Sequence, residues 1–211
     1  MIIKLLWQDT HLFATIIFLV VFSVCCHEFM HAFVALKMGD DTAARCGHLT
    51  LNPLKQMGWF SLIMLLFIGI AWGQVPVNRA NFRSRAGIVL TSLAGPLTNL
   101  ALWLIFIVLC LITYINGKNE FAIQMLACGA TLNLMLFVFN LLPIPGLDGF
   151  NILIEFFPGL FRRDSEVIKG AYLLLVILLF SCSERLFLVA GDITEKTFFL
   201  ILRAVAAWTT A

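Results

Sequence analysis

Long apolar runs, separated by short polar segments, dominate the chain. The runs at residues 12–36, 86–114 and 121–142 each exceed the roughly 20 residues that a membrane-spanning helix needs. The run at residues 58–72 has 15 residues, which is short for a span and typical of a re-entrant or interfacial segment. The pattern predicts a polytopic membrane protein with helical spans.

Shorter elements follow the third long run. Pro143 and Pro145 end that run, because proline lacks an N–H group and clashes with the preceding helical turn. A short helix is expected at residues 149–157. Charged residues interrupt the apolar stretches at 170–182 and 197–208, so the pattern leaves open whether the tail forms one span or two.

The polar connection at residues 42–56 has a different pattern. Polar and apolar residues alternate in GHLTLNP up to Pro53, as is typical of a short strand. We therefore expect a small membrane-associated β-hairpin near residues 45–80. By hypothesis, the edge of the strand at 48–51 pairs with an extended substrate.

Composition supports a membrane protein. The chain of 211 residues is 61% hydrophobic and 12% charged, whereas soluble domains are about half apolar and about a quarter charged. We expect an all-α bundle of about five to six transmembrane or re-entrant helices, forming one domain (1–211) with a core at 12–155 and a helical tail at 160–211. The net charge of +2 gives no indication of nucleic acid, and the expected surroundings are the lipid bilayer.

The distribution of Lys and Arg predicts the orientation. If the short run at 58–72 does not cross, six of these residues lie in 37–85 on one side, one lies in the opposite turn at 116–120, and three lie in 143–169. Because Lys and Arg favour cytoplasmic loops, the first loop is expected to be cytoplasmic. The prediction is a multi-pass protein of the cell (plasma or inner) membrane.

Ionisable residues interrupt the first long run. HEFMH at residues 27–31 matches the H-E-x-x-H pattern, in which two histidines four apart share a helix face and bind one zinc ion. Glu28 between His27 and His31 is then the general base that activates a water. Ionisable groups within a span are costly and by default indicate function. The alternatives are a buried hydrogen-bonded network without metal and a helix end that already lies among the lipid headgroups.

A catalytic zinc ion usually has three protein ligands and one open position. The candidates for the third ligand are Asp40 and Asp41 just past the helix, His48, and Asp148. Asp148 is best placed, since it lies at the same predicted depth as the histidines. A plain N-cap for a helix beginning at Gly149 explains Asp148 equally well.

Three motifs together resemble the site-2 protease family of intramembrane zinc metallopeptidases. They are HEFMH, SLAGPLTNL at residues 92–100 and NLLPIPGLDGFN at residues 140–151. They occur in the order and topology of that family, and the match covers roughly residues 15–155. The chain has no room for an inserted PDZ domain and so resembles the compact branch of the family.

The resemblance implies one zinc ion per chain, bound by His27, His31 and Asp148, with Glu28 as the catalytic residue. It implies hydrolysis of peptide bonds in transmembrane or membrane-anchored protein substrates, either in regulated intramembrane proteolysis or in the clearance of signal-peptide remnants. The active site is then expected toward the cytoplasmic side.

Two asparagines in the motifs have two interpretations each. Asn99 and Asn140 either form hydrogen bonds between helices, as asparagine often does in membranes, or lie near the substrate or behind a metal ligand.

A non-catalytic metal-binding transporter or sensor is the alternative function. A transporter needs no Glu28 beside an open coordination position. It would also need more polar groups in its spans than Thr98, Asn99, Asn133 and the motif residues.

Overall fold

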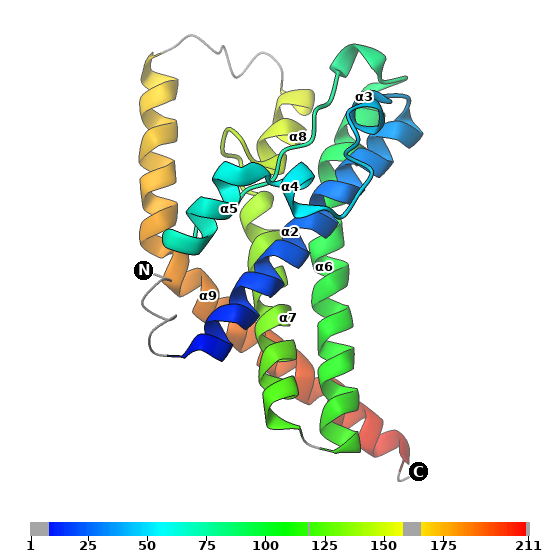
Figure 1. Cartoon of the computed structure of the whole chain (residues 1–211), viewed down its shortest axis with the longest axis vertical. Coiled ribbons are helices and arrows are strands. Elements are labelled where there is room, and N and C mark those ends of the chain that lie inside the picture. Colours follow the sequence, from blue (N-terminus) through cyan, green and yellow to red (C-terminus); the bar gives the residue numbers. More distant parts are fainter. Residues whose placement is uncertain (1–8, 118, 158–165, 210–211) are drawn as a thin grey trace.

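The computed structural model describes residues 9–117, 119–157 and 166–209, and its regular structure there is helical (Figure 1). Three helices are long and apolar enough to cross a membrane: α2 (Thr10–Met38), α6 (Arg85–Asn116) and α7 (Glu120–Asn140). At 1.5 Å per residue they measure about 44, 48 and 32 Å, and a bilayer core is about 30 Å thick. The three predicted long runs are therefore confirmed as helices that are long enough to span a bilayer.

The three long helices share one apolar core. Leu19 of α2, Phe106 and Ile107 of α6, and Ala130 and Leu132 of α7 are buried against one another. A second cluster, of Val24, Cys25, Met57 and Leu65, packs short helices onto the same α2. These contacts fix α2 between the long helices on one side and the 53–67 region on the other.

The predicted β-hairpin near residues 45–80 is not found. This region is described throughout, contains no strand and forms α3 (Thr42–Arg45, ending where the region begins), α4 (Pro53–Gln56), α5 (Gly58–Phe67) and a 3₁₀ turn η1 (Arg79–Asn81). The alternating stretch before Pro53 takes its hydrogen bonds from a side chain instead of a neighbouring strand. The buried Gln56 Nε2 donates to the carbonyls of His48 (2.8 Å) and Thr50 (2.6 Å).

Helix α5, with ten residues, is too short to cross a bilayer. The hypothesis of a substrate-pairing edge at 48–51 loses its strand, since the His48 and Thr50 carbonyls are already bonded within the chain.

Asp40 organises the loops at the end of α2. Its buried carboxylate accepts hydrogen bonds from the backbone N–H of Asn78 (2.7 Å), from Asn81 Nδ2 (2.9 Å), and from both the backbone N–H and the hydroxyl of Thr42. Burial alone would raise the pKa of Asp40, but these hydrogen bonds outweigh it and hold the pKa below its usual value. Asp40 thus joins the end of α2 to the segment that precedes α6.

The tail forms one helix. After α8 (Asp148–Phe156), α9 extends continuously over Glu166–Thr209. The two apolar stretches of the tail, which the sequence pattern left as either one span or two, thus belong to one helix. In Figure 1, α9 changes direction along its length and crosses behind α7. Within the described residues, three helices qualify as spans and α5 is a shorter apolar helix, so the count differs from the five to six transmembrane or re-entrant helices expected.

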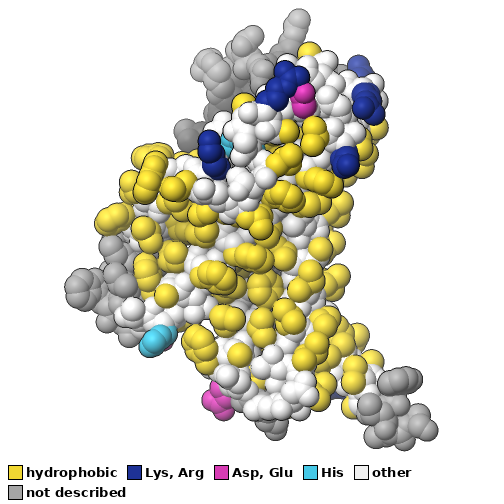
Figure 2. Space-filling view, turned by 45° about the vertical axis from the view of Figure 1, so that its right-hand side comes forward, with side chains coloured by type: hydrophobic (Ala, Val, Ile, Leu, Met, Phe, Trp, Pro, Cys, Tyr) yellow, Lys and Arg dark blue, Asp and Glu magenta, His cyan; other side chains and the backbone are white. Residues whose placement is uncertain are grey.

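Charge is distributed unevenly along the molecule. Figure 2 shows Lys and Arg side chains gathered at one end, beyond a broad band of hydrophobic side chains. This is the end at which α2 finishes beside Lys37 and α6 begins at Arg85. Apolar length, exposed hydrophobic surface and polar ends together identify a membrane protein.

Candidate metal centre

One face of α2 carries three buried ionisable side chains. His27, Glu28 and His31 are 6%, 8% and 7% exposed. Because the histidines are four residues apart on a helix, they share one face of α2, and their rings meet edge to face with the two Nε2 atoms 3.0 Å apart. His31 precedes the end of α2 at Met38 by seven residues, about 10 Å of helix.

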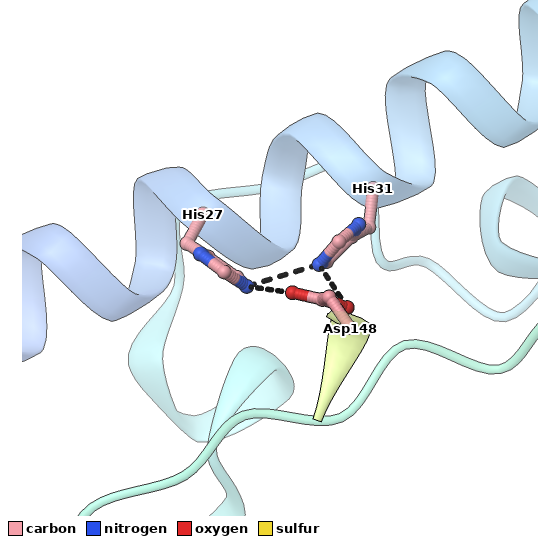
Figure 3. A group of neighbouring side chains, drawn as sticks. All are labelled: His27, His31 and Asp148. Atoms are coloured by element: carbon pink, nitrogen blue, oxygen red, sulfur yellow. Dashed lines mark hydrogen bonds and ion pairs between the residues drawn. The ribbon is translucent and has the colours of Figure 1, made fainter. Parts of the chain in front are cut away.

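Asp148 completes this group from a distant part of the sequence. Its Oδ2 lies 3.1 Å from His27 Nε2, and its Oδ1 lies 3.2 Å from His31 Nε2 (Figure 3). Asp148 is the first residue of α8, and the N-cap position belongs to Leu147, which makes no side-chain capping bond. The N-cap interpretation of Asp148 is therefore wrong: its carboxylate points at the histidines.

Gly149 lets α8 begin this close to the end of α7. A Cβ atom at residue 149 would lie 2.1 Å from the carbonyl oxygen of Leu141. The Asp-Gly pair thus combines a ligand side chain with the small residue that its position needs.

The other ring nitrogens of the histidines are held by acceptors. His31 Nδ1 lies 2.6 Å from the backbone oxygen of Thr91, and His27 Nδ1 lies 2.6 Å from Asn99 Oδ1. A backbone carbonyl accepts hydrogen bonds and never donates them, so His31 carries its proton on Nδ1. In the neutral ring, Nε2 then presents a lone pair toward Asp148.

The arrangement fits a metal ion. His27, His31 and Asp148 each offer one ligand atom, and these atoms lie within 4.8 Å of one another. Lone pairs and a carboxylate that converge in a buried place repel one another unless a cation lies among them. Asp148 Oδ2 is also buried without a hydrogen-bond donor among the described residues.

Helix α6 leaves space for such an ion at Gly95. A Cβ atom there would lie 2.4 Å from both His27 Nε2 and His31 Nε2. The missing side chain thus opens the position toward which both nitrogens point. Two imidazoles and one carboxylate are a zinc ligand set that leaves a fourth position open, and zinc is the cofactor that this group is built to bind.

Glu28 lies in the same cavity as His27, His31 and Asp148. The cavity has a volume of about 830 Å³, and its lining includes His27, His31, Asp148, Glu28 and, from the segment that connects α5 to η1, residues 68–75 and 77. The backbone of this segment touches the carboxylate: a Cβ atom at Gly73 would lie 2.2 Å from Glu28 Cγ and 2.3 Å from Glu28 Oε1.

Hydrogen bonds hold this connecting segment in place. The buried Ser61 Oγ donates to the carbonyl of Trp72 (2.7 Å) and accepts from its N–H (2.9 Å). The backbone N–H of Gln74 donates to the carbonyl of Gln56 (3.0 Å). Sequence reasoning missed this segment as part of the site, because its contacts use backbone atoms, which leave no signature in residue type.

The two motif asparagines lie in different places. Asn99 contacts His27 directly, whereas Asn140 donates to the carbonyl of Leu136 one turn earlier (3.0 Å) and lines the cavity without contacting a ligand. Thr91, whose carbonyl holds His31, was not a candidate, since a backbone acceptor has no sequence signal.

The other candidates for the third ligand have partners elsewhere. Asp40 bonds within its loop, Asp41 pairs with Arg45 on the surface, and His48 Nδ1 lies 3.4 Å from Gln56 Oε1. The structure does not bring any of them to the histidine pair.

A His-His-Asp group with an adjacent Glu, in a protein with three membrane-length helices, is the arrangement of a metallopeptidase site. Comparison with known proteins agrees: residues 111–182 match the family model "Peptidase family M50". The chain is 36% identical over 184 residues to "Putative zinc metalloprotease YwhC" of Bacillus subtilis, covering 83% of this chain and 84% of that protein. The chain therefore belongs to peptidase family M50, the family that its motifs resemble.

Other relatives are longer than the matched region. "Putative zinc metalloprotease Rip2" of Mycolicibacterium smegmatis is 35% identical over 165 residues, which cover 74% of this chain and 63% of that protein. Rip2 of Mycobacterium tuberculosis is 37% identical over 134 residues, which cover 61% of this chain and 51% of that protein. No solved structure matches the chain.

Proposed function

We propose that this protein is an intramembrane zinc endopeptidase that hydrolyses peptide bonds of transmembrane or membrane-anchored proteins. The observation that carries the proposal is the position of Glu28. It lies between two metal-ligating histidines on a membrane-length helix and faces the same cavity as Asp148. The relatives named zinc metalloproteases support the same reaction class.

Each residue has a defined role in the proposed hydrolysis. When bound by His27, His31 and Asp148, zinc supplies Lewis acidity, which lowers the pKa of a water toward about 7 and polarises a carbonyl. Glu28 accepts the proton of the attacking water and passes it to the leaving amine nitrogen. Burial excludes bulk water from these charges, which strengthens their interactions with the reacting atoms.

We propose that the site lies toward the cytoplasmic side of the cell membrane. His27 and His31 lie in the second half of α2, toward the end at which Lys and Arg gather (Figure 2). Positive residues favour the cytoplasmic side. Substrates enter from the bilayer or its cytoplasmic surface, in regulated proteolysis or in the clearance of signal-peptide remnants.

The proposal is tested by comparing wild type with Glu28→Gln in reconstituted membranes that contain a membrane-anchored substrate. Both proteins are expected to bind one zinc ion per chain, and only wild type is expected to cleave. Cleavage by both would remove Glu28 from the mechanism. Zinc binding without cleavage of a panel of membrane-anchored substrates, together with zinc transport into vesicles, would support the transporter alternative instead.

A further inference from the structure

A buried chain of polar side chains leads away from the metal site through three helices. It runs from His27 on α2 to Asn99 on α6, then to Asn133 on α7, and returns to Ser23 on α2. The distances along it are 2.6, 3.0 and 2.9 Å. Ser23, Asn99 and Asn133 are fully buried, so bulk water does not replace a broken link.

A backbone carbonyl sets the direction of this chain. Asn133 Nδ2 lies 2.9 Å from the carbonyl oxygen of Gly129, an acceptor that cannot donate. The amide nitrogen of Asn133 must therefore point at Gly129, and its oxygen must point at Asn99. Since Asn133 Oδ1 only accepts, Asn99 must offer Nδ2 to it and direct its own Oδ1 at His27.

The consequence reaches the metal ligand. Because Asn99 Oδ1 is an acceptor, His27 must carry its proton on Nδ1, and Nε2 keeps the lone pair that faces Asp148. His31 obtains the same tautomer directly from the Thr91 carbonyl. Backbone carbonyls thus determine the tautomers of both histidines: the Thr91 carbonyl acts on His31 directly, and the Gly129 carbonyl acts on His27 through the amides of Asn133 and Asn99.

We infer that Asn133 is a positioning residue for the zinc site, which fixes the tautomer and orientation of His27 through Asn99. Ser23 accepts the second N–H of the Asn133 amide and thereby leaves no donor of that amide unpaired. None of the hydrogen bonds of Asn133 reaches His27, His31 or Asp148, so its effect on zinc passes through Asn99. The inference rests on His27 being a zinc ligand, as in the proposed function.

The effect is measured as zinc affinity in a chelator competition. Asn133→Leu keeps the approximate size of the side chain but removes the acceptor for Asn99 Nδ2, so the Asn99 amide is free to turn its nitrogen toward His27. Loss of such support behind a ligand typically weakens metal binding about 10- to 100-fold, and that is the expected loss. Asn133→Thr is expected to weaken zinc binding less. A helical threonine hydroxyl donates to the carbonyl one turn earlier, and its oxygen remains an acceptor.

Thr194→Val is the matched control. Trp103 Nε1 donates to the buried Thr194 Oγ1 (3.1 Å), so this variant also breaks a hydrogen bond between α6 and α9, but at residues that do not line the cavity. It is expected to lower thermal stability and leave zinc affinity unchanged. An equal loss of zinc affinity in Thr194→Val and Asn133→Leu would reduce the role of Asn133 to general stability.

A double-mutant cycle tests whether Asn133 acts through Asn99. Asn99→Leu alone is expected to weaken zinc binding, and adding Asn133→Leu is expected to weaken it no further. Additive losses of zinc affinity would refute the idea that Asn133 acts through Asn99. In ¹⁵N-histidine NMR of metal-free protein at alkaline pH, where the imidazole rings are neutral, His27 is expected as the Nδ1–H tautomer in wild type and as a mixture in Asn133→Leu.

The outcomes separate this inference from the proposed function. If wild type bound no zinc, the proposed function itself would fail. If wild type and both Asn133 variants bound zinc equally, only the positioning role would fail.

Discussion

Adding a single methyl group at Gly95 should close the space in which the metal ion is bound. In Gly95→Ala the new Cβ would lie 2.4 Å from the Nε2 atoms of both His27 and His31. Nonbonded heavy atoms prefer about 3.5 Å or more, so α6 or both rings must move by about 1 Å. Zinc–nitrogen bonds are about 2.0–2.1 Å long, and such a displacement separates the ligand atoms.

The magnitudes favour loss of the metal over loss of the fold. Overpacking costs about 1–3 kcal/mol, and replacing a helical glycine by alanine returns about 1 kcal/mol. The net loss of stability in Gly95→Ala is therefore at most about 2 kcal/mol. Zinc affinity is expected to fall at least about 100-fold, equivalent to about 2.7 kcal/mol.

The assay is chelator competition on purified protein, with thermal unfolding of the same samples. Gly191→Ala on α9 is the matched control, because a Cβ atom there meets nothing closer than Thr131 Cγ2 at 3.8 Å. The control is expected to bind zinc normally. Gly95→Ala binding zinc within about threefold of wild type would refute the reasoning that the ion lies against α6.

Two further predictions concern the surroundings of the site. Gly73→Ala should abolish cleavage and retain zinc, because its Cβ would displace the Glu28 carboxylate but not the ligands; full activity in membranes would contradict this. Asp40→Asn should lower the stability of the native protein. Since the native pKa of Asp40 is lowered, its contribution is full above the unfolded pKa of about 4 and is lost as the pH falls through the native pKa. The difference in thermal stability between wild type and Asp40→Asn should therefore be largest near neutral pH and shrink in acid, and a constant difference would contradict the assignment.

Helical periodicity was sufficient to predict part of the site. His27 and His31 share a face because they are four residues apart, a local property that folding does not alter. The depth of Asp148 followed from counting spans and charges, although the sequence alone could not separate a ligand from an N-cap. That distinction depends on where α8 begins relative to α2, which is a tertiary fact.

The 45–80 region shows why the remainder was not predicted. Alternation before Pro53 is a genuine strand pattern, yet its carbonyls are satisfied by the Gln56 amide, and no strand forms. Contacts of this kind join residues through geometry that residue type does not encode. The same holds for the approach of Gly73 to Glu28 and for the link from Asn133 to Asn99.

X-ray absorption at the zinc edge tests the central claim most directly. The zinc-loaded protein in detergent should contain one zinc ion per chain, surrounded only by nitrogen and oxygen at about 2.0–2.2 Å. Histidine ring scattering should be visible in wild type and reduced in His31→Ala. Sulfur at about 2.3 Å would place the metal at cysteines, and would contradict a centre built from His27, His31 and Asp148.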